Sequence, residues 1–266
     1  MFVAIVLILK IILVSFISLL LSLAAIKFVH AIGIDIKDFK QRTKPIFLFI
    51  AAIFNLIFVG VVFLILRYID NKPFNVLGFL MNIRALCFSL IALAATLLMA
   101  FIFIKILQKF KVFNVRFMKN YFSNSQGILA LILGYLVLFI AAFQEELMFR
   151  GYFTYLLQPY GFITAMLLSS IIFTVWHFIT NKVNLFQALD WLLGGLMLFY
   201  VYTRTGSIWA STIVHFSRNF ANVLLLNIAQ SNSLFEFDKP IPPKYKTIYT
   251  LTLSIVIALI TYLFYR

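Results

Sequence analysis

Acidic residues are scarce in this chain, which has 8 aspartates and glutamates in 266 residues against 22 lysines and arginines. Charged residues of both signs make up 11% of the sequence, whereas soluble domains average about 25%. A chain with so little charge cannot cover a large surface in contact with water. We therefore expect no soluble domain.

Cysteine is almost absent. Cys87 is the single one, so an intramolecular disulfide and a cysteine-based metal site are both excluded. A nucleophilic cysteine needs a base close by, and the apolar segment around Cys87 contains none. We interpret Cys87 as a small residue of the hydrophobic core.

Apolar sequence is what the chain has in excess, with 64% hydrophobic and 18% aromatic residues. Eight stretches are long enough to cross a bilayer, which takes about 20 residues each. They are Ile11–Val29, Pro45–Leu66, Ala85–Ile104, Ile128–Phe149 or beyond, Phe162–Ile179, Leu185–Tyr202, Ser207–Ile228 and Thr247–Phe264. The first has no signal-peptide cleavage pattern and is expected to be retained. The sequence thus predicts an all-α polytopic membrane protein with about eight transmembrane helices.

The net charge of +14 comes mainly from the loops between these spans and is not a signature of nucleic-acid binding. Fourteen lysines and arginines lie in the odd-numbered loops, and six lie in the even-numbered loops and the C-terminal tail. Since positive residues concentrate on the cytoplasmic side, we expect the odd loops in the cytoplasm and both termini outside.

Composition divides the chain into three parts. Residues 1–127 hold the first three spans and a basic, aromatic segment, Lys105–Gly127, that we expect at the headgroup level. Residues 128–230 form a central helical core. Residues 231–266 hold a loop and the last span. The prolines of Gln230–Lys246 predict an extended loop there rather than a helix.

Two adjacent carboxylates, Glu145 and Glu146, lie inside the fourth apolar stretch. A charged side chain at the centre of a bilayer costs at least about 2.5 kcal/mol, so it marks a functional site by default. The other polar residues at comparable depth are few: His177, Asp190, His215 and Asn219. This set points to a site inside the membrane.

The spacing around Pro159-Tyr160-Gly161 brings two of these residues to one depth. Glu145 precedes Gly161 by 16 residues, and His177 follows it by 16 residues. If the fourth helix continues to about Gln158, it forms an antiparallel hairpin with the fifth. Both side chains then lie at the same distance from the turn. His215, in the seventh span, is expected at a similar level.

The chemistry of the set suggests a division of roles. Glu145 and Glu146 point about 100° apart on a helix. Arg150 follows Glu146 at the i+4 spacing of an ion pair, which leaves Glu145 to face a cavity as a general base. His215 and Asn219 share one helix face, so both can donate hydrogen bonds to one developing oxyanion.

Other polar or small residues of the core are interpreted as structural. Asp190 is expected to accept hydrogen bonds, and Arg218 either pairs with Asp190 or extends toward the headgroups. Gly194-Gly195 is expected to allow close packing of helices.

Three short motifs resemble those of the CPBP (CaaX-processing and bacteriocin-processing, or Abi) intramembrane proteases, a family that includes the type II CaaX prenyl endopeptidases. They are Glu145-Glu146-x-x-x-Arg150, Phe173-x-x-x-His177 and His215-x-x-x-Asn219, and the resemblance covers about Ile128–Leu226. The resemblance implies a fold of eight helices. It also implies an activity, the hydrolysis of peptide bonds by a water molecule that a glutamate activates.

Carried onto this chain, the resemblance assigns the general base to Glu145 and the holding of the water to His177. His215 and Asn219 would line the oxyanion hole, with Glu146 and Arg150 in support. We favour a reaction without a cofactor. Zinc is the alternative, and Glu145, His177 and His215 would then be its ligands.

The expected substrate is a membrane-associated peptide or protein, and the expected location is a bacterial plasma membrane. An alternative is a non-catalytic protein that acts in bacteriocin self-immunity or as a membrane scaffold. A proton-coupled transporter is a third option, because intramembrane glutamate and histidine also mark proton relays. The complete set of two glutamates, two histidines and an asparagine favours the enzyme.

Overall fold

The computed structural model describes all residues except 1, 37, 43, 119–124, 181–183 and 229–232. Its long helices are α1 (Phe2–Ala31), α3 (Pro45–Leu64), α4 (Ile83–Lys109), α5 (Ser125–Glu146), α7 (Phe162–Thr180), α8 (Leu185–Thr205), α9 (Ile208–Leu224) and α10 (Pro243–Tyr265). The short elements are α2 (Phe39–Arg42), η1 (Ile65–Ile69), η2 (Phe74–Leu77), η3 (Leu147–Phe153), α6 (Thr154–Leu157), η4 (Gln158–Tyr160), β1 (Val115–Phe117) and β2 (Phe235–Phe237).

Each of the eight predicted spans overlaps one long helix, which confirms the all-α polytopic fold. Among the described residues, seven of these helices are long and apolar enough to cross a membrane. Large apolar side chains are exposed along them, as a bilayer requires. The eighth, α9, has only 17 residues and a more polar sequence.

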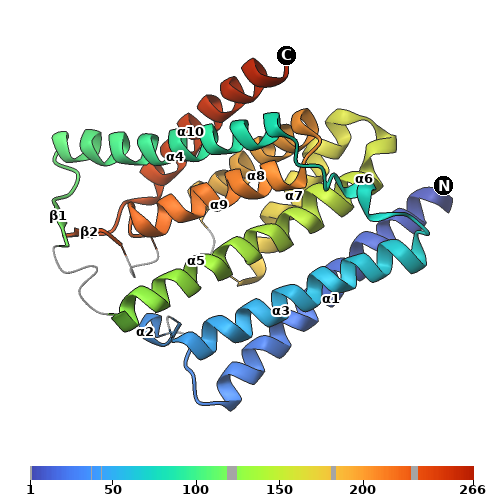
Figure 1. Cartoon of the computed structure of the whole chain (residues 1–266), viewed down its shortest axis with the longest axis horizontal. Coiled ribbons are helices and arrows are strands. Elements are labelled where there is room, and N and C mark those ends of the chain that lie inside the picture. The colour runs from blue at the N-terminus through green and yellow to red at the C-terminus, as the bar shows by residue number, and fades with distance from the viewer. Residues whose placement is uncertain (1, 37, 43, 119–124, 181–183, 229–232) are drawn as a thin grey trace.

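Helix α9 lies at the centre of the bundle. Figure 1 shows α4, α9, α5, α3 and α1 following one another across the view, and α9 also packs against α8. Every side chain of α9 is buried or half-buried. Because its neighbours shield it from lipid, α9 can carry His215, Arg218 and Asn219 at low cost.

The fourth span is one continuous helical segment. It runs through α5, η3, α6 and η4 to Tyr160, turns at Gly161 and returns as α7. The segment η3 is a π-helix, in which the backbone bonds span five residues, and it begins directly after Glu146. Such local widening of a helix is rare and occurs mostly at functional sites. The predicted hairpin, with its turn at residues 159–161, is confirmed.

The contact between the segment that precedes α4 and the start of α9 depends on one glycine. Gly78 has a φ of +76°, and a Cβ atom there would lie 2.8 Å from the carbonyl oxygen of Gly206. Only glycine accepts both the dihedral angle and the contact. The Gly78 carbonyl then accepts a 2.7 Å hydrogen bond from the backbone N–H of Ile208, in the first turn of α9.

The structure differs from the sequence prediction at three places. Strands β1 and β2 pair as an antiparallel two-stranded sheet, which three-residue strands do not reveal in a sequence. The loop expected over Gln230–Lys246 ends earlier, because α10 begins at Pro243. The prediction treated this proline as a helix breaker, but proline is well suited to the first turn of a helix.

The third difference is Cys87, which is exposed on α4 and not in the core. Lipid hydrocarbon chains are as apolar as a protein core. The residues around a cysteine are therefore equally apolar whether it faces lipid or the interior, and the sequence alone does not distinguish the two positions.

The expected orientation in the membrane stays a prediction, as does the division at residues 127 and 230. Three of the basic residues behind the orientation, Lys37, Lys119 and Lys182, lie outside the described residues. Part of the expected headgroup segment, residues 119–124, lies outside them as well.

Candidate active site

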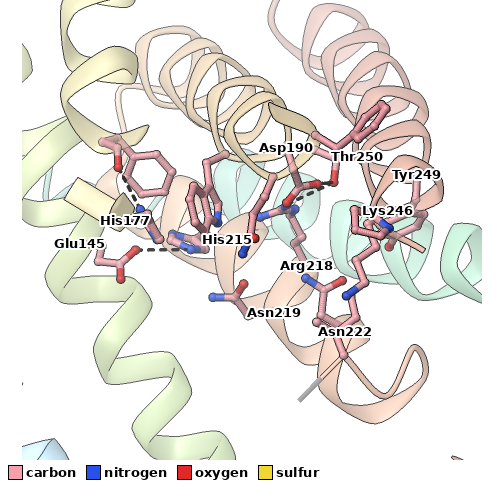
Figure 2. A pocket seen from close by; sticks show the side chains of 16 residues that line it. Glu145, His177, Asp190, His215, Arg218, Asn219, Asn222, Lys246, Tyr249 and Thr250 are labelled. Atoms are coloured by element: carbon pink, nitrogen blue, oxygen red, sulfur yellow. Dashed lines mark hydrogen bonds and ion pairs between the residues drawn. The ribbon is translucent and has the colours of Figure 1, made fainter. Parts of the chain in front are cut away.

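Four of the six predicted site residues line one cavity of about 230 Å³ between α5, α7, α8, α9 and α10. They are Glu145, His177, His215 and Asn219. Figure 2 shows them at one end of the cavity, with Glu145 and His177 on the side of His215 away from Asp190. Residues from three separate apolar stretches thus meet at one place.

The other two predicted residues, Glu146 and Arg150, do not line the cavity. Both are buried, with 0% and 1% of their surface exposed. Nη1 of Arg150 lies 3.4 Å from Oε1 of Glu146, the ion pair that the i+4 spacing indicates. The π-helical turn between them does not break this contact.

Arg150 is held from several sides. Its Nη2 donates a 3.1 Å hydrogen bond to the carbonyl of Gly195, and its guanidinium stacks 4.4 Å from the ring centroid of Phe173. A Cβ atom on Gly195 would lie 3.1 Å from Cβ of Ser170. Glycine therefore lets α8 approach α7, as predicted, and brings a backbone carbonyl within reach of a buried cation.

His215 links the two glutamates. Its Nδ1 lies 2.9 Å from Oε1 of Glu146, and its Nε2 lies 3.7 Å from Oε2 of Glu145. The carboxylates diverge, as expected for neighbours on a helix, yet both reach one imidazole because its two nitrogens are on different edges of the ring. Since a carboxylate only accepts, Nδ1 of His215 carries a hydrogen.

The same argument assigns the tautomer of His177. Its Nδ1 lies 2.9 Å from the carbonyl oxygen of Phe173, one turn earlier in α7. The carbonyl accepts, so this nitrogen donates, and in the neutral ring Nε2 is the acceptor. The rings of Phe173 and Trp191 flank the imidazole at centroid distances of 4.6 Å and 4.9 Å. These contacts hold the ring in one orientation.

A second polar cluster lies at the other end of the cavity (Figure 2). Nη2 of Arg218 donates to Oδ2 of Asp190 at 2.6 Å and to Oγ1 of Thr250 at 3.1 Å. Thr250 in turn donates to Oδ1 of Asp190. Arg218 thus pairs with Asp190, one of the two options left open by the sequence, and Asp190 is the expected acceptor.

Sequence reasoning missed several residues of this end, namely Gln187, Asn222, Lys246 and Thr250. Asn222 could have been found, because it follows Asn219 by three residues and so shares its helix face. Lys246 could not, since the predicted loop removed it from any helix.

Glu145, His177 and His215 supply the carboxylate and imidazole donors that catalytic zinc sites use. Within the described part of the chain, however, no three histidine, cysteine, aspartate or glutamate side chains are grouped closely enough to hold a metal ion. The three donors line a cavity but do not surround one point in this arrangement.

Residues 127–221 match the family model described as type II CAAX prenyl endopeptidase Rce1-like. Over this segment the chain is similar to the family that carried the resemblance, which includes these endopeptidases. The matched residues contain all six predicted site residues and agree with the range Ile128–Leu226 that carried the resemblance. No match was found among the curated proteins or among the solved structures.

The matched segment does not account for the whole cavity. It covers less than half of the chain and ends at residue 221, before Asn222 and before α10. Lys246, Tyr249 and Thr250 line the cavity from α10 and are therefore outside the matched family segment.

Proposed function

We propose that this protein is an intramembrane endopeptidase that hydrolyses a peptide bond of a membrane-associated peptide or protein with water activated by Glu145. The observation that carries the proposal is the position of Glu145. Its carboxylate lines the cavity and lies 3.7 Å from Nε2 of His215, which is itself anchored to Glu146. The similarity of residues 127–221 to a family of endopeptidases supports it.

In the proposed reaction Glu145 takes a proton from water, and the resulting hydroxide attacks the carbonyl carbon of the scissile bond. Glu145 then transfers this proton to the leaving nitrogen as the C–N bond breaks. His177 helps to position the water through Nε2, because its Nδ1 is occupied by the Phe173 carbonyl. General-base catalysis of this kind contributes about 10²–10⁴-fold in rate.

The oxyanion that forms is stabilised by donors from α9. Asn219 follows His215 by one helical turn, and both line the cavity. The amide of Asn219 donates through Nδ2, and His215 donates through Nε2 in its doubly protonated form. Glu145 and Glu146 flank this ring and balance its charge, while Arg150 balances the second carboxylate.

Glu146 and Arg150 act as positioning residues. They touch neither cavity nor substrate, but the Glu146 carboxylate holds Nδ1 of His215 and so sets the direction of Nε2. Hydrogen-bond donors that already point at the developing oxyanion stabilise the transition state, because no side chain has to move during the reaction. We further propose a bacterial plasma membrane as the site of action and a reaction that needs no metal.

The proposal is tested by comparing membrane peptidomes of cells that carry the wild type, Glu145→Gln or Glu236→Gln. Glu236 is an exposed acid on β2 and serves as the matched control. Specific cleavage products should be present with the wild type and with Glu236→Gln and absent with Glu145→Gln. Identical peptidomes from all three would favour the non-catalytic alternative, a self-immunity or scaffold protein.

Metal dependence is tested separately on purified protein. A metal-free reaction predicts less than stoichiometric zinc and full activity after treatment with a chelator. One tightly bound zinc per active chain, lost in His215→Ala, would instead make His215 a metal ligand.

A further inference from the structure

The cavity has a polar end that hydrolysis does not use. Asp190, Arg218 and Thr250 form a closed hydrogen-bonded group there, in which both oxygens of Asp190 are occupied. The charges of Asp190 and Arg218 cancel. What remains at this end is a second cation, Lys246, which also lines the cavity.

Lys246 is half-buried and makes no ion pair of its own among the described residues. Asp190, the carboxylate whose charge acts on it, is already paired with Arg218. Within the described part of the chain, no carboxylate lies within ion-pair distance of it, although six other such contacts are present. A cation that is partly removed from water without an anion is destabilising. This arrangement indicates an anion that comes from outside the chain.

The local electrostatics strengthen this indication. Lys246 lies in the first turn of α10, which begins at Pro243. The helix dipole makes this end positive, so it attracts anions and disfavours a lysine. Arg218 also lines the cavity, but its Nε is buried and its side chain is only 8% exposed, so Lys246 is the cation that a ligand can reach.

Neutral donors complete the same end of the cavity. Asn222 lies beside Lys246 (Figure 2), Gln187 lines the same cavity, and each carries an amide that can donate two hydrogen bonds. A carboxylate accepts several such bonds at once and bonds to a charged donor about twice as strongly as a neutral acceptor does. The chemistry of this lining fits a carboxylate group.

We propose that the Lys246 end of the cavity is a subsite for a carboxylate of the peptide substrate, so that the enzyme prefers peptides with a negative charge on one side of the scissile bond. The inference rests on the proposed function, because it places the peptide between Glu145 and Lys246 in one continuous cavity. Lys246 and Asn222 both lie beyond residue 221, so this preference belongs to this chain and does not follow from the matched segment.

Two sources supply such a carboxylate, the C-terminus of the peptide or an aspartate or glutamate side chain. The probe is a library of fluorescent hexapeptides in three forms: free acids, C-terminal amides, and amides with a single aspartate or asparagine at each position. Binding is measured by fluorescence anisotropy with full-length Glu145→Gln protein in lipid nanodiscs. Cleavage of the same peptides is measured with Glu145 intact.

The subsite predicts tighter binding of the charged peptide of each pair by about tenfold or more, the range for a hydrogen bond to a charged group. Preference for acids over amides identifies the C-terminus, and preference for aspartate over asparagine identifies a side chain. Lys246→Met should abolish the preference, and Lys246→Arg should retain it. Lys244→Met is the matched control, because Lys244 is exposed, does not line the cavity and lies over the ring of Tyr245; it should retain the preference.

Equal binding of charged and neutral peptides, no binding of any acidic peptide, or a preference that survives in Lys246→Met would each overturn the subsite. The two proposals fail separately. If the peptides are cleaved without any preference for charge, the endopeptidase proposal stands and the subsite proposal fails. If binding depends on Lys246 but no peptide is cleaved, the subsite proposal stands and the endopeptidase proposal fails.

Discussion

Nδ1 of His215 and Oε1 of Glu146 are 2.9 Å apart, although 69 residues separate them in the chain. The contact joins the central helix α9 to the end of α5, just where the π-helical turn begins. It also gives the second glutamate of the pair a role distinct from that of the first. Glu145 faces the cavity, and Glu146 determines how His215 faces it.

Glu146→Gln should lower kcat by about 10- to 100-fold with little change in KM, because one hydrogen bond to a charged group contributes about 1.5–3 kcal/mol. The amide keeps the shape of the side chain but loses the negative charge beside His215. Steady-state kinetics on reconstituted protein provide the measurement. A kcat within twofold of the wild type would show that Glu146 does not position His215.

Arg150→Met should destabilise the protein by about 3–5 kcal/mol, because it leaves the buried Glu146 carboxylate without its cation. The double variant Glu146→Gln with Arg150→Met should recover part of this loss, since no charge is then left unpaired. Thermal unfolding in detergent compares the three proteins. Equal unfolding temperatures for Arg150→Met and the wild type would contradict the role of the ion pair.

Asn219→Ala should reduce kcat by about 10²–10³-fold, the effect of losing one oxyanion donor. Binding of substrate should change little, because the charge develops only in the transition state. Combined with His215→Ala, the loss should be less than additive if the two donors act as a unit. A variant that raised KM and left kcat unchanged would place Asn219 in substrate binding instead.

Gly78→Ala should impair folding, because a Cβ atom would meet the Gly206 carbonyl at 2.8 Å and the residue has a positive φ. Gly60→Ala is the matched control, since a Cβ there meets no atom within 4 Å and the residue lies inside α3. The yield of folded protein after solubilisation distinguishes the two. Equal yields would show that the α8–α9 turn tolerates a side chain at position 78.

The position of a residue along its helix could be derived from the sequence, and rotation about each helix could not. The 16-residue spacings on either side of Gly161 predicted that Glu145 and His177 lie near each other, because rise per residue is nearly constant in a helix, and both side chains line one cavity. The contact between Glu146 and His215 depends on how α5 and α9 are rotated and how far apart they lie. Only packing determines these quantities.

Residues after irregular segments were harder to place. The sequence singled out Asp190 and Arg218, whereas their partner Thr250 and the neighbouring Lys246 went unnoticed on a helix that follows a proline-containing loop. The prolines were taken as breakers throughout, although Pro243 begins α10. Short strands such as β1 and β2 have too few residues for a visible alternation of polarity.

The most direct test of Glu145 as the general base is the single-turnover cleavage rate of one peptide by purified, reconstituted protein. Wild type, Glu145→Gln and the control Glu236→Gln are compared at equal amounts of folded protein. The account predicts that Glu145→Gln is slower by about 10²–10⁴-fold while Glu236→Gln matches the wild type. Cleavage by well-folded Glu145→Gln at a rate close to that of the wild type would contradict it.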